Sequence, residues 1–222
     1  MSLLNYFKRP IRFDYLLRFI ASNQKIKVMD IGCGNNSAYK TKLYFPNCEY
    51  HGLDKIKNCN NDAINFKLME KFYQIDLDNS KLNELPDNYY DCIIFSHVIE
   101  HLTNGLDLLE LLINKLAQNG IIYIETPSQR SLSLPSMKGV LNFWDDPTHI
   151  KVYDLNEMVG TLRQKNCQIL YSKTRRSLKR ILFFPAYTVY SLFKNRYIIS
   201  TVFWDLLGFA NIVIAKKTFN EK

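Results

Sequence analysis

The chain of 222 residues lacks several features that would place it in a specialised class. No window approaches the roughly 20 consecutive apolar residues that span a bilayer. The N-terminal stretch carries a charge every few positions and has no continuous apolar run, which argues against a signal peptide. The five cysteines are odd in number and scattered without a CxxC pair, so neither a disulfide framework nor a zinc knuckle is indicated. We therefore expect reduced thiols in a cytoplasmic protein.

Internal repeats and low-complexity linkers are absent too. With 47% hydrophobic and 23% charged residues, the composition is that of a folded chain. The length suits one domain with its own core and is short for two. A net charge of +8 indicates an anionic partner, but it does not decide between nucleic acid, a lipid surface and a phosphorylated metabolite.

Apolar patterns predict strands and helices in alternation. A first helix is expected over 13–20, and strands are expected at 26–31, 49–54, 72–77, 90–96, 121–125, 167–171 and 211–215. A stripe from Leu102 to Leu116 predicts a helix that stops at Asn119-Gly120, and Asp154 with Glu157 forms a capping box for another. The order predicts a single α/β domain over 1–222, with a helical entry at 1–24 and a mostly parallel sheet covered on both faces.

The turn after the first strand contains few glycines for a nucleotide site. Gly32 and Gly34 stand where the chain must turn sharply, but Ser37 replaces the third glycine of the dinucleotide fingerprint. Asp30 also places a carboxylate beside the turn, where a cationic ligand fits better than a pyrophosphate. Nicotinamide and flavin cofactors are therefore disfavoured.

Two more carboxylates are expected at the ends of the next strands. Asp54 closes the second strand, where it could accept both hydroxyls of a ribose. Asp76 closes the third, where it could bind the amine of an adenine. Each aspartate alone could instead cap the following helix, but three at such positions favour a nucleoside site.

These segments together resemble a known family. VMDIGCGNN, HGLDK, FYQIDLDN, YYDCIIFSHVIEHL and NGIIYIETP are similar to the successive motifs of class I S-adenosylmethionine-dependent methyltransferases, over about residues 26–217. The resemblance implies a Rossmann-like sheet of seven strands whose last strand runs antiparallel beside 167–171. It also implies S-adenosyl-L-methionine as the cofactor. The cofactor-binding residues that it implies are Asp30, Gly32, Cys33 and Gly34 at the methionine half, Asp54 and Lys55 at the ribose, Asp76 and Leu77 at the adenine, and Ser96 and His97 near the sulfonium.

Three of the four histidines could converge over the transferred methyl. His97, Glu100 and His101 follow the fourth strand, and His149 lies in a loop after the fifth. They could be ordinary cap and first-turn residues. Alternatively, His149, with His101 nearby, could remove the proton of a hydroxyl acceptor, since imidazole titrates near neutral pH. We predict His149 and His101 as the catalytic residues.

A metal site is the third interpretation of these residues. The pattern H-x-x-E-H with a distant His149 is similar to the E-x-x-E-H motif that holds a divalent ion in small-RNA 3′-terminal 2′-O-methyltransferases. Here His97 stands where the first glutamate belongs. We therefore expect no metal.

A long segment, 172–210, separates the last two predicted strands. Its first part carries Lys173, Arg175, Arg176, Lys179 and Arg180, and no acid occurs before Asp205. Aromatic and aliphatic residues follow at partly helical spacing. The segment could be a helical cap, or it could rest on an anionic membrane surface. Nucleic acid is the less favoured partner because the aliphatic content is high.

The entry KRPIR and the segment DPTHIKVY resemble bacterial methyltransferases of surface-polysaccharide assembly. We therefore expect an O-methyltransferase that acts on a sugar or sugar-linked group of a surface glycan or its precursor. It would be cytoplasmic, with peripheral contact at the inner face of the membrane. The alternatives are a metal-dependent RNA 2′-O-methyltransferase and a non-catalytic nucleoside-binding module.

Overall fold

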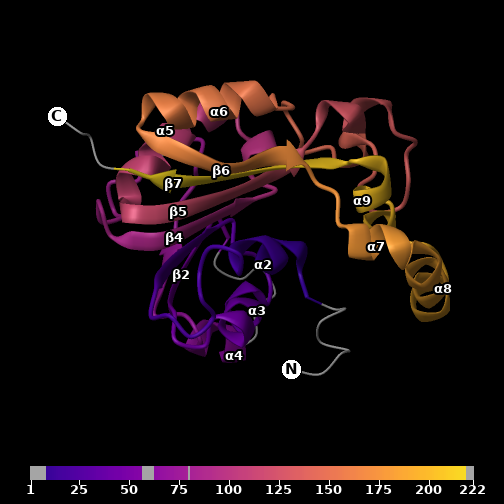
Figure 1. Cartoon of the computed structure of the whole chain (residues 1–222), viewed down its shortest axis with the longest axis horizontal. Coiled ribbons are helices and arrows are strands. Elements are labelled where there is room, and N and C mark those ends of the chain that lie inside the picture. The colour runs from indigo at the N-terminus through magenta and orange to yellow at the C-terminus, as the bar shows by residue number, and fades with distance from the viewer. Residues whose placement is uncertain (1–8, 57–62, 80, 219–222) are drawn as a thin grey trace.

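The computed structural model describes residues 9–56, 63–79 and 81–218. At its centre is one seven-stranded sheet in the order β3-β2-β1-β4-β5-β7-β6 (Figure 1). The strands are β1 Lys27–Ile31, β2 Glu49–Asp54, β3 Lys71–Gln74, β4 Tyr90–Ser96, β5 Leu116–Pro127, β6 Cys167–Thr174 and β7 Ala210–Lys217. The α-helices are α2 Ile11–Leu16, α3 Ser37–Tyr44, α4 Ala63–Lys67, α5 Gly105–Lys115, α6 Leu155–Gln164, α7 Leu178–Leu182, α8 Phe184–Asn195 and α9 Trp204–Leu207. Short 3-10 helices are η1 Ile99–His101, η2 Gln129–Ser133, η3 Phe143–Asp145 and η4 Ser200–Val202.

The strand directions confirm the predicted Rossmann-like topology. β1 pairs in parallel with both β2 and β4, and β4 pairs in parallel with β5. β7 runs antiparallel between β5 and β6. The carboxyl ends of β1, β2 and β4 therefore meet at one edge of the sheet, which is where open α/β sheets bind their ligands.

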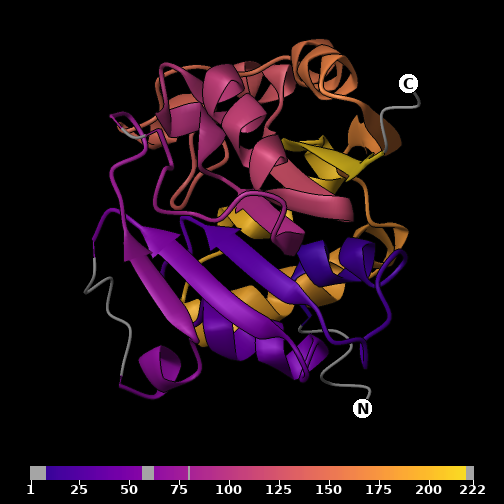
Figure 2. The same cartoon turned by 90° about the vertical axis from the view of Figure 1, so that its left-hand side faces the viewer.

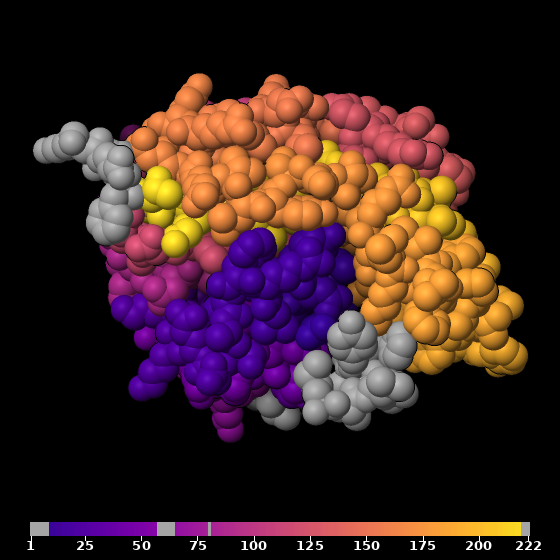
Figure 3. Space-filling model, in the orientation of Figure 1, coloured from indigo at the N-terminus to yellow at the C-terminus, as the bar shows by residue number. Residues whose placement is uncertain are grey.

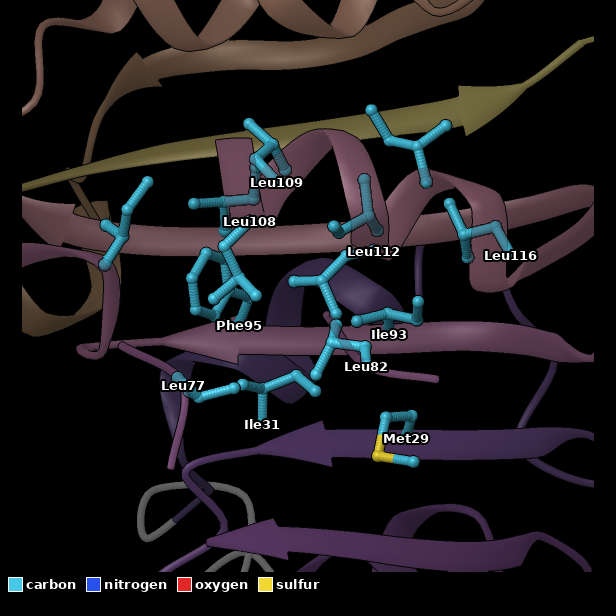
Figure 4. Packing of buried hydrophobic residues seen from close by; sticks show 14 of the residues in the cluster. Met29, Ile31, Leu77, Leu82, Ile93, Phe95, Leu108, Leu109, Leu112 and Leu116 are labelled. Atoms are coloured by element: carbon cyan, nitrogen blue, oxygen red, sulfur yellow. The ribbon is translucent and has the colours of Figure 1, made fainter. Parts of the chain in front are cut away.

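Helices cover both faces of this sheet (Figure 2). On one face, the leucine stripe of α5 packs against β1 and β4, and Figure 4 shows Leu108, Leu109 and Leu112 above Ile93 and Phe95. On the other face, α2 and α3 pack their apolar residues onto the opposite sides of the same strands. Burying each large apolar side chain contributes about 1.5–3 kcal/mol, so the two cores fix the strand ends that carry the polar residues.

One predicted helix boundary is wrong. α5 starts at Gly105 and ends at Lys115, and the residues up to Asn119-Gly120 belong to the irregular start of β5. The helix ends where Leu116 becomes extended and pairs with Tyr90 of β4, and the ammonium group of Lys217 caps this end by donating to the carbonyls of Ile113 and Leu116, at 3.0 and 2.9 Å. This cap comes from the last strand, about 100 residues away, so no local signal could have shown it.

The third strand is also shorter than predicted. It ends at Gln74, so Asp76 lies two residues beyond the strand and not at its end. The capping box of α6 is confirmed, since Asp154 accepts from the backbone of Asn156 and Glu157 accepts from the backbone of Asp154. The four cysteines in the described ranges are free thiols, and Cys59 lies outside those ranges.

The segment between β6 and β7 is helical, as predicted, although β6 extends into it as far as Thr174. It contains α7, α8, η4 and α9, and Figure 1 shows it at the end of the sheet where β4 and β5 finish. Among the described residues, no helix combines the length and apolar character needed to cross a membrane.

Candidate functional site

The glycine turn after β1 is tight on one side and open on the other. Gly32 has φ +65°, and a β-carbon there would lie 2.4 Å from Cγ2 of Val98. Gly34 has φ +48°, and a β-carbon there would meet only the carbonyl of Gly32, at 3.9 Å. The backbone N–H of Cys33 donates to Leu53 at 3.0 Å and ties the turn to β2. The turn therefore presses against the β4–η1 connection and leaves space above Gly34 for a ligand.

Asp30 braces this turn from below. Its carboxylate is buried, and one oxygen accepts bonds from the Tyr50 hydroxyl, at 2.9 Å, and from Ser37. Arg12 donates to the same Ser37 hydroxyl at 2.8 Å. These bonds hold the start of α3 against β1 and β2. Contact between Asp30 and the methionine half of a cofactor stays a prediction.

Asp54 joins the ends of the first two strands. One carboxylate oxygen accepts the N–H of Gly34 at 3.1 Å, and the other accepts the N–H of Ile56 at 3.2 Å. The side chain is half-buried, so it lies at the rim of the space above the turn. This position is consistent with the predicted role at the ribose.

Lys55 and Asp76 form an ion pair at 2.9 Å beyond the ends of β2 and β3. Their hydrogen bond lowers the pKa of Asp76 and raises that of Lys55. Leu77 is buried in the core next to this pair. The ion pair engages the Asp76 carboxylate that was expected to bind the adenine amine, and the roles of Lys55 at the ribose and of Asp76 and Leu77 at the adenine stay predictions.

His97 follows Ser96 at the end of β4 and has a left-handed backbone, with φ +56°. Its Nδ1 donates to Glu100 at 3.1 Å, and its Nε2 lies 3.5 Å from Glu125, within ion-pair range but beyond a good hydrogen bond. Burial alone would lower the pKa of His97, but Glu100 and Glu125 together raise it to about 9. His97 is therefore a cation at neutral pH and a poor proton acceptor.

Behind His97 lies a buried charge network that the sequence did not reveal. Arg175 donates to Glu125 at 2.8 Å and to Asp205 at 2.7 Å, and all three side chains are almost fully buried. Burial raises the pKa of Glu125, but Arg175 and His97 more than reverse this and hold it below its ordinary value. The expectation that Arg175 is a surface cation is thus wrong. Glu125 directly follows the apolar run 121–124 within β5. A carboxylate at such a buried position needs a cation as its partner, and this was the one signal of the network in the sequence.

His101 and His149 lie together with Glu100. Their ring centroids are 4.8 Å apart, and the three side chains offer ligand atoms within 4.8 Å of one another. Nδ1 of His149 is 2.6 Å from the carbonyl of Phe143, so it must carry the proton and donate. Nδ1 of His101 is 2.9 Å from the hydroxyl oxygen of Thr148 and 3.1 Å from its carbonyl. Because that hydroxyl gives its proton to Asp146, at 2.6 Å, Nδ1 of His101 donates as well. Each imidazole therefore keeps the lone pair of its Nε2 for another partner.

The structure thus separates the four residues considered for a metal. Glu100, His101 and His149 form a group, while His97 lies outside it, with its two ring nitrogens engaged by Glu100 and Glu125. Both oxygens of Glu100 already accept bonds, one from His97 and one from Thr126 at 3.1 Å. Each oxygen keeps a second lone pair, so the group could hold a cation through two nitrogens and one carboxylate.

A cavity of about 510 Å³ opens beside these groups. Its lining includes His97, His101 and His149 together with Trp204 and Phe209. The rings of His97 and Trp204 lie side by side, with centroids 5.1 Å apart. The rings of Trp204 and Phe209 stack, with centroids 4.4 Å apart. Neither was predicted as a site residue, because both belong to the segment between β6 and β7, and only folding brings that segment to the carboxyl ends of the strands.

Comparisons with known proteins agree with this architecture. Residues 5–172 match the model of a family described as a methyltransferase domain. Ubiquinone biosynthesis O-methyltransferases of Rickettsia canadensis and Rickettsia felis are 29% and 27% identical over 122 residues, which cover 53% of this chain. Those residues are 51% and 49% of the relatives' own lengths, so the match spans about half of each relative.

Solved structures show the same fold. A S-adenosylmethionine-dependent methyltransferase from Mesorhizobium loti gives a TM-score of 0.68 at 13% identity, covering 95% of this chain and 99% of that one. A SAM-dependent methyltransferase from Archaeoglobus fulgidus gives a TM-score of 0.57 at 21% identity, covering 97% of this chain and 100% of that one. At these identities the likeness is one of fold.

Proposed function

Because this chain belongs to the methyltransferase domain family, whose fold it shares with S-adenosylmethionine-dependent enzymes, we propose that it is an S-adenosylmethionine-dependent O-methyltransferase of a small-molecule hydroxyl. The main support for O-methylation in the structure is the imidazole pair of His101 and His149. Both line the cavity, and both keep an Nε2 lone pair because their Nδ1 protons are bonded to backbone carbonyls. The relatives named for O-methylation support the same reaction.

The described residues fit the cofactor of this family. Gly34 leaves open space over the turn, and Asp54 offers a carboxylate at the rim of that space for the ribose hydroxyls. His97 and Ser96 end β4 between this turn and the acceptor cavity. When bound, S-adenosylmethionine supplies a methyl group on a positively charged sulfur. The three buried carboxylates Glu100, Glu125 and Asp205 outnumber the two cations His97 and Arg175 and so favour a further cation nearby.

His149 acts as the general base in this proposal. Its Nε2 would take the proton of the acceptor hydroxyl as the oxygen bonds to the methyl carbon and that carbon leaves the cofactor's sulfur, which would become a neutral thioether. The imidazole would then carry the positive charge. The carboxylate of Asp146, with an oxygen 3.9 Å from that Nε2, then stabilises the charge before the proton passes to water. The protein otherwise contributes by holding the oxygen in line with the methyl group.

For the acceptor we propose a sugar or sugar-linked hydroxyl, as expected from the sequence. Trp204, which stacks on the buried Phe209, offers a partly exposed apolar ring, and Asp146 and His149 offer polar partners in the same cavity lining. An acceptor of the ubiquinone-biosynthesis kind is the competing substrate, since the relatives carry that name.

A second candidate is a metal-dependent 2′-O-methyltransferase acting on RNA. The observation that favours it is the group of Glu100, His101 and His149, whose imidazole Nδ1 atoms donate to carbonyl groups as metal-binding histidines usually do. In that case the ion would polarise the acceptor oxygen, and His149 would not act as a base.

Methyl transfer to a panel of acceptors tests the proposal. Sugar nucleotides, lipid-linked sugars, ubiquinone precursors and small RNA would be incubated with S-adenosylmethionine, with and without chelator, and products followed by mass spectrometry. His149→Ala should lower turnover about 10²–10⁴-fold and leave cofactor affinity unchanged by calorimetry. His101→Asn is the matched variant, and it should cost less.

The outcomes separate the candidates. In the metal-dependent case, chelator should abolish activity and a divalent ion should restore it. His101→Asn, His149→Ala and Glu100→Gln should then lose activity equally. This result would show that a metal ion, and not a histidine base, activates the acceptor. A chain that binds the cofactor and methylates none of the acceptors would contradict the enzyme and favour a nucleoside-binding module.

A further inference from the structure

The outer face of α7 and α8 is apolar and exposed. Leu178, Leu182 and Phe193 are 83%, 75% and 84% exposed, and Val189 and Leu192 are each about half exposed. Leu178 and Leu182 are four residues apart in α7, and Val189 and Phe193 are four residues apart in α8, so each pair lies on one side of its own helix. We call these five side chains the α7–α8 apolar face. In Figures 1 and 3, α8 projects from one end of the molecule, beyond the sheet.

Cations accompany this face, and the acid that interacts with them comes from another element, since Asp14 of α2 acts electrostatically on Lys179. Seven lysines and arginines and no aspartate or glutamate occur between Ser172 and Phe203. Arg175 belongs to the buried network. Four other cations lie along α7 and α8 or directly after them: Lys179, Arg180, Lys194 and Arg196. A helix with exposed aliphatic and aromatic side chains and flanking cations is typical of proteins that lie on an anionic bilayer.

A small cavity of about 220 Å³ lies on the inner side of α8. Arg180 and Lys194 line it together with the tyrosines at 187 and 190, and no carboxylate takes part in its lining. The guanidinium of Arg180 donates to the backbone carbonyl of Arg9 at 2.9 Å, which holds it at the cavity wall. Two cations and two phenol hydroxyls around a pocket of this size suit a phosphate group.

We propose that α7 and α8 dock the protein on an anionic phospholipid bilayer, with the α7–α8 apolar face among the acyl chains and a lipid phosphate in the cavity of Arg180 and Lys194. A second copy of this chain fits the face less well, because a twofold contact would set the cations of 172–204 against their own copies, and that stretch carries no acid to pair them. RNA would leave the aliphatic side chains without a partner.

The docking surface and the acceptor cavity share a wall. Ile199 and Thr201 line both the 220 Å³ cavity and the 510 Å³ cavity that holds His149. A hydroxyl carried by a membrane lipid would thus reach the acceptor cavity from the docked face. This last step rests on the proposed methyl transfer, but the docking does not.

Co-sedimentation of the full chain with vesicles tests the docking. We expect binding to vesicles that contain roughly one third phosphatidylglycerol at low salt, little binding to pure phosphatidylcholine, and release at high salt. Lys194→Ser should weaken binding about fivefold, and Phe193→Ser by at least tenfold. Lys25 lies just before β1, and its side chain is exposed. Lys25→Ser is therefore the matched control and should bind vesicles as the wild type does.

Absence of binding at low salt would overturn the proposal, and so would an equal loss in Lys25→Ser and Lys194→Ser. Self-association that Phe193→Ser abolishes, without vesicle binding, would assign the face to a second copy, and binding to RNA alone would assign it to nucleic acid. Cofactor affinity, measured by calorimetry, should stay unchanged in all variants. Failure of the docking is therefore distinguishable from failure of the methyltransferase assignment.

Discussion

Replacing Arg175 by methionine should destabilise the protein by about 3–5 kcal/mol, because it leaves two buried carboxylates without their cation. Arg175 makes two bonds to Asp205, at 2.7 and 3.2 Å, and one to Glu125, at 2.8 Å. Glu125 would keep His97 and the hydroxyl of Tyr123, so most of the cost falls on Asp205. For a domain whose whole stability is about 5–15 kcal/mol, this is a large fraction.

The loss should first appear where Arg175 joins two parts of the chain. Its guanidinium links β5 to the segment that carries α7, α8 and α9, and it lies 5.2 Å from the ring centre of Trp204. Urea unfolding should therefore be followed by circular dichroism for the whole fold and by the fluorescence of Trp204 for the segment. A Trp144→Phe background removes the other tryptophan, which is 63% exposed.

Two further variants make the test specific. Arg176→Met is the control, because this neighbour is exposed and bonds to the carbonyl of Leu206, and it should cost about 1 kcal/mol or less. Adding Asp205→Asn to Arg175→Met should recover part of the lost stability by removing the uncompensated charge. If Arg175→Met costs no more than Arg176→Met, the network does not anchor the segment and the reasoning fails.

Three other measurements test residues at and around the predicted cofactor site, one through cofactor affinity and two through stability. Asp54→Asn should weaken S-adenosylmethionine binding by about 1.5–3 kcal/mol in calorimetry, and unchanged affinity would remove Asp54 from the site. Gly32→Ala should lower the free energy of unfolding by about 2–4 kcal/mol through backbone strain and the clash with Val98, so Val98→Ala should cost less in that background than in the wild type. The raised pKa of His97, about 9 against about 6.5 when unfolded, stabilises the fold below pH ~6.5 and loses this effect as the pH rises through 9. Because the side chain is 28% exposed, we expect the stability gap between wild type and His97→Gln to shrink by about 1–2 kcal/mol over that range, and a constant gap would contradict the pairing.

Most of the fold could be predicted from local patterns. The alternation of buried strands and amphipathic helices, the left-handed turn at Gly32 and the capping box of Asp154 each follow from residues close in sequence. Asp30 and Asp54 could be placed at the sheet edge because a strand's carboxyl end is visible in its apolar run. The resemblance to class I methyltransferases added the antiparallel last strand, which periodicity alone does not give.

The site itself was only partly visible. The sequence singled out His101 and His149, but the proton positions that leave both Nε2 lone pairs open depend on carbonyl groups at Thr148 and Phe143. It grouped His97 with them, whereas the fold places that ring between Glu100 and Glu125. Which carboxylate a histidine meets is set by the packing of neighbouring strands.

By itself, the sequence determined the kind of fold and the edge of the sheet at which a nucleoside can bind, because burial on one face repeats every few residues and strand ends are marked locally. Only the tertiary structure decided which charges meet. Arg175 is 50 residues from Glu125 and 30 from Asp205, and nothing local distinguishes it from the surface cation Arg176 beside it. The same holds for Lys217, whose ammonium group caps the C-terminal carbonyls of α5 from a position about 100 residues later in the sequence. Local periodicity sets which face of an element is buried, but the docking of distant elements selects the partner of each buried polar group.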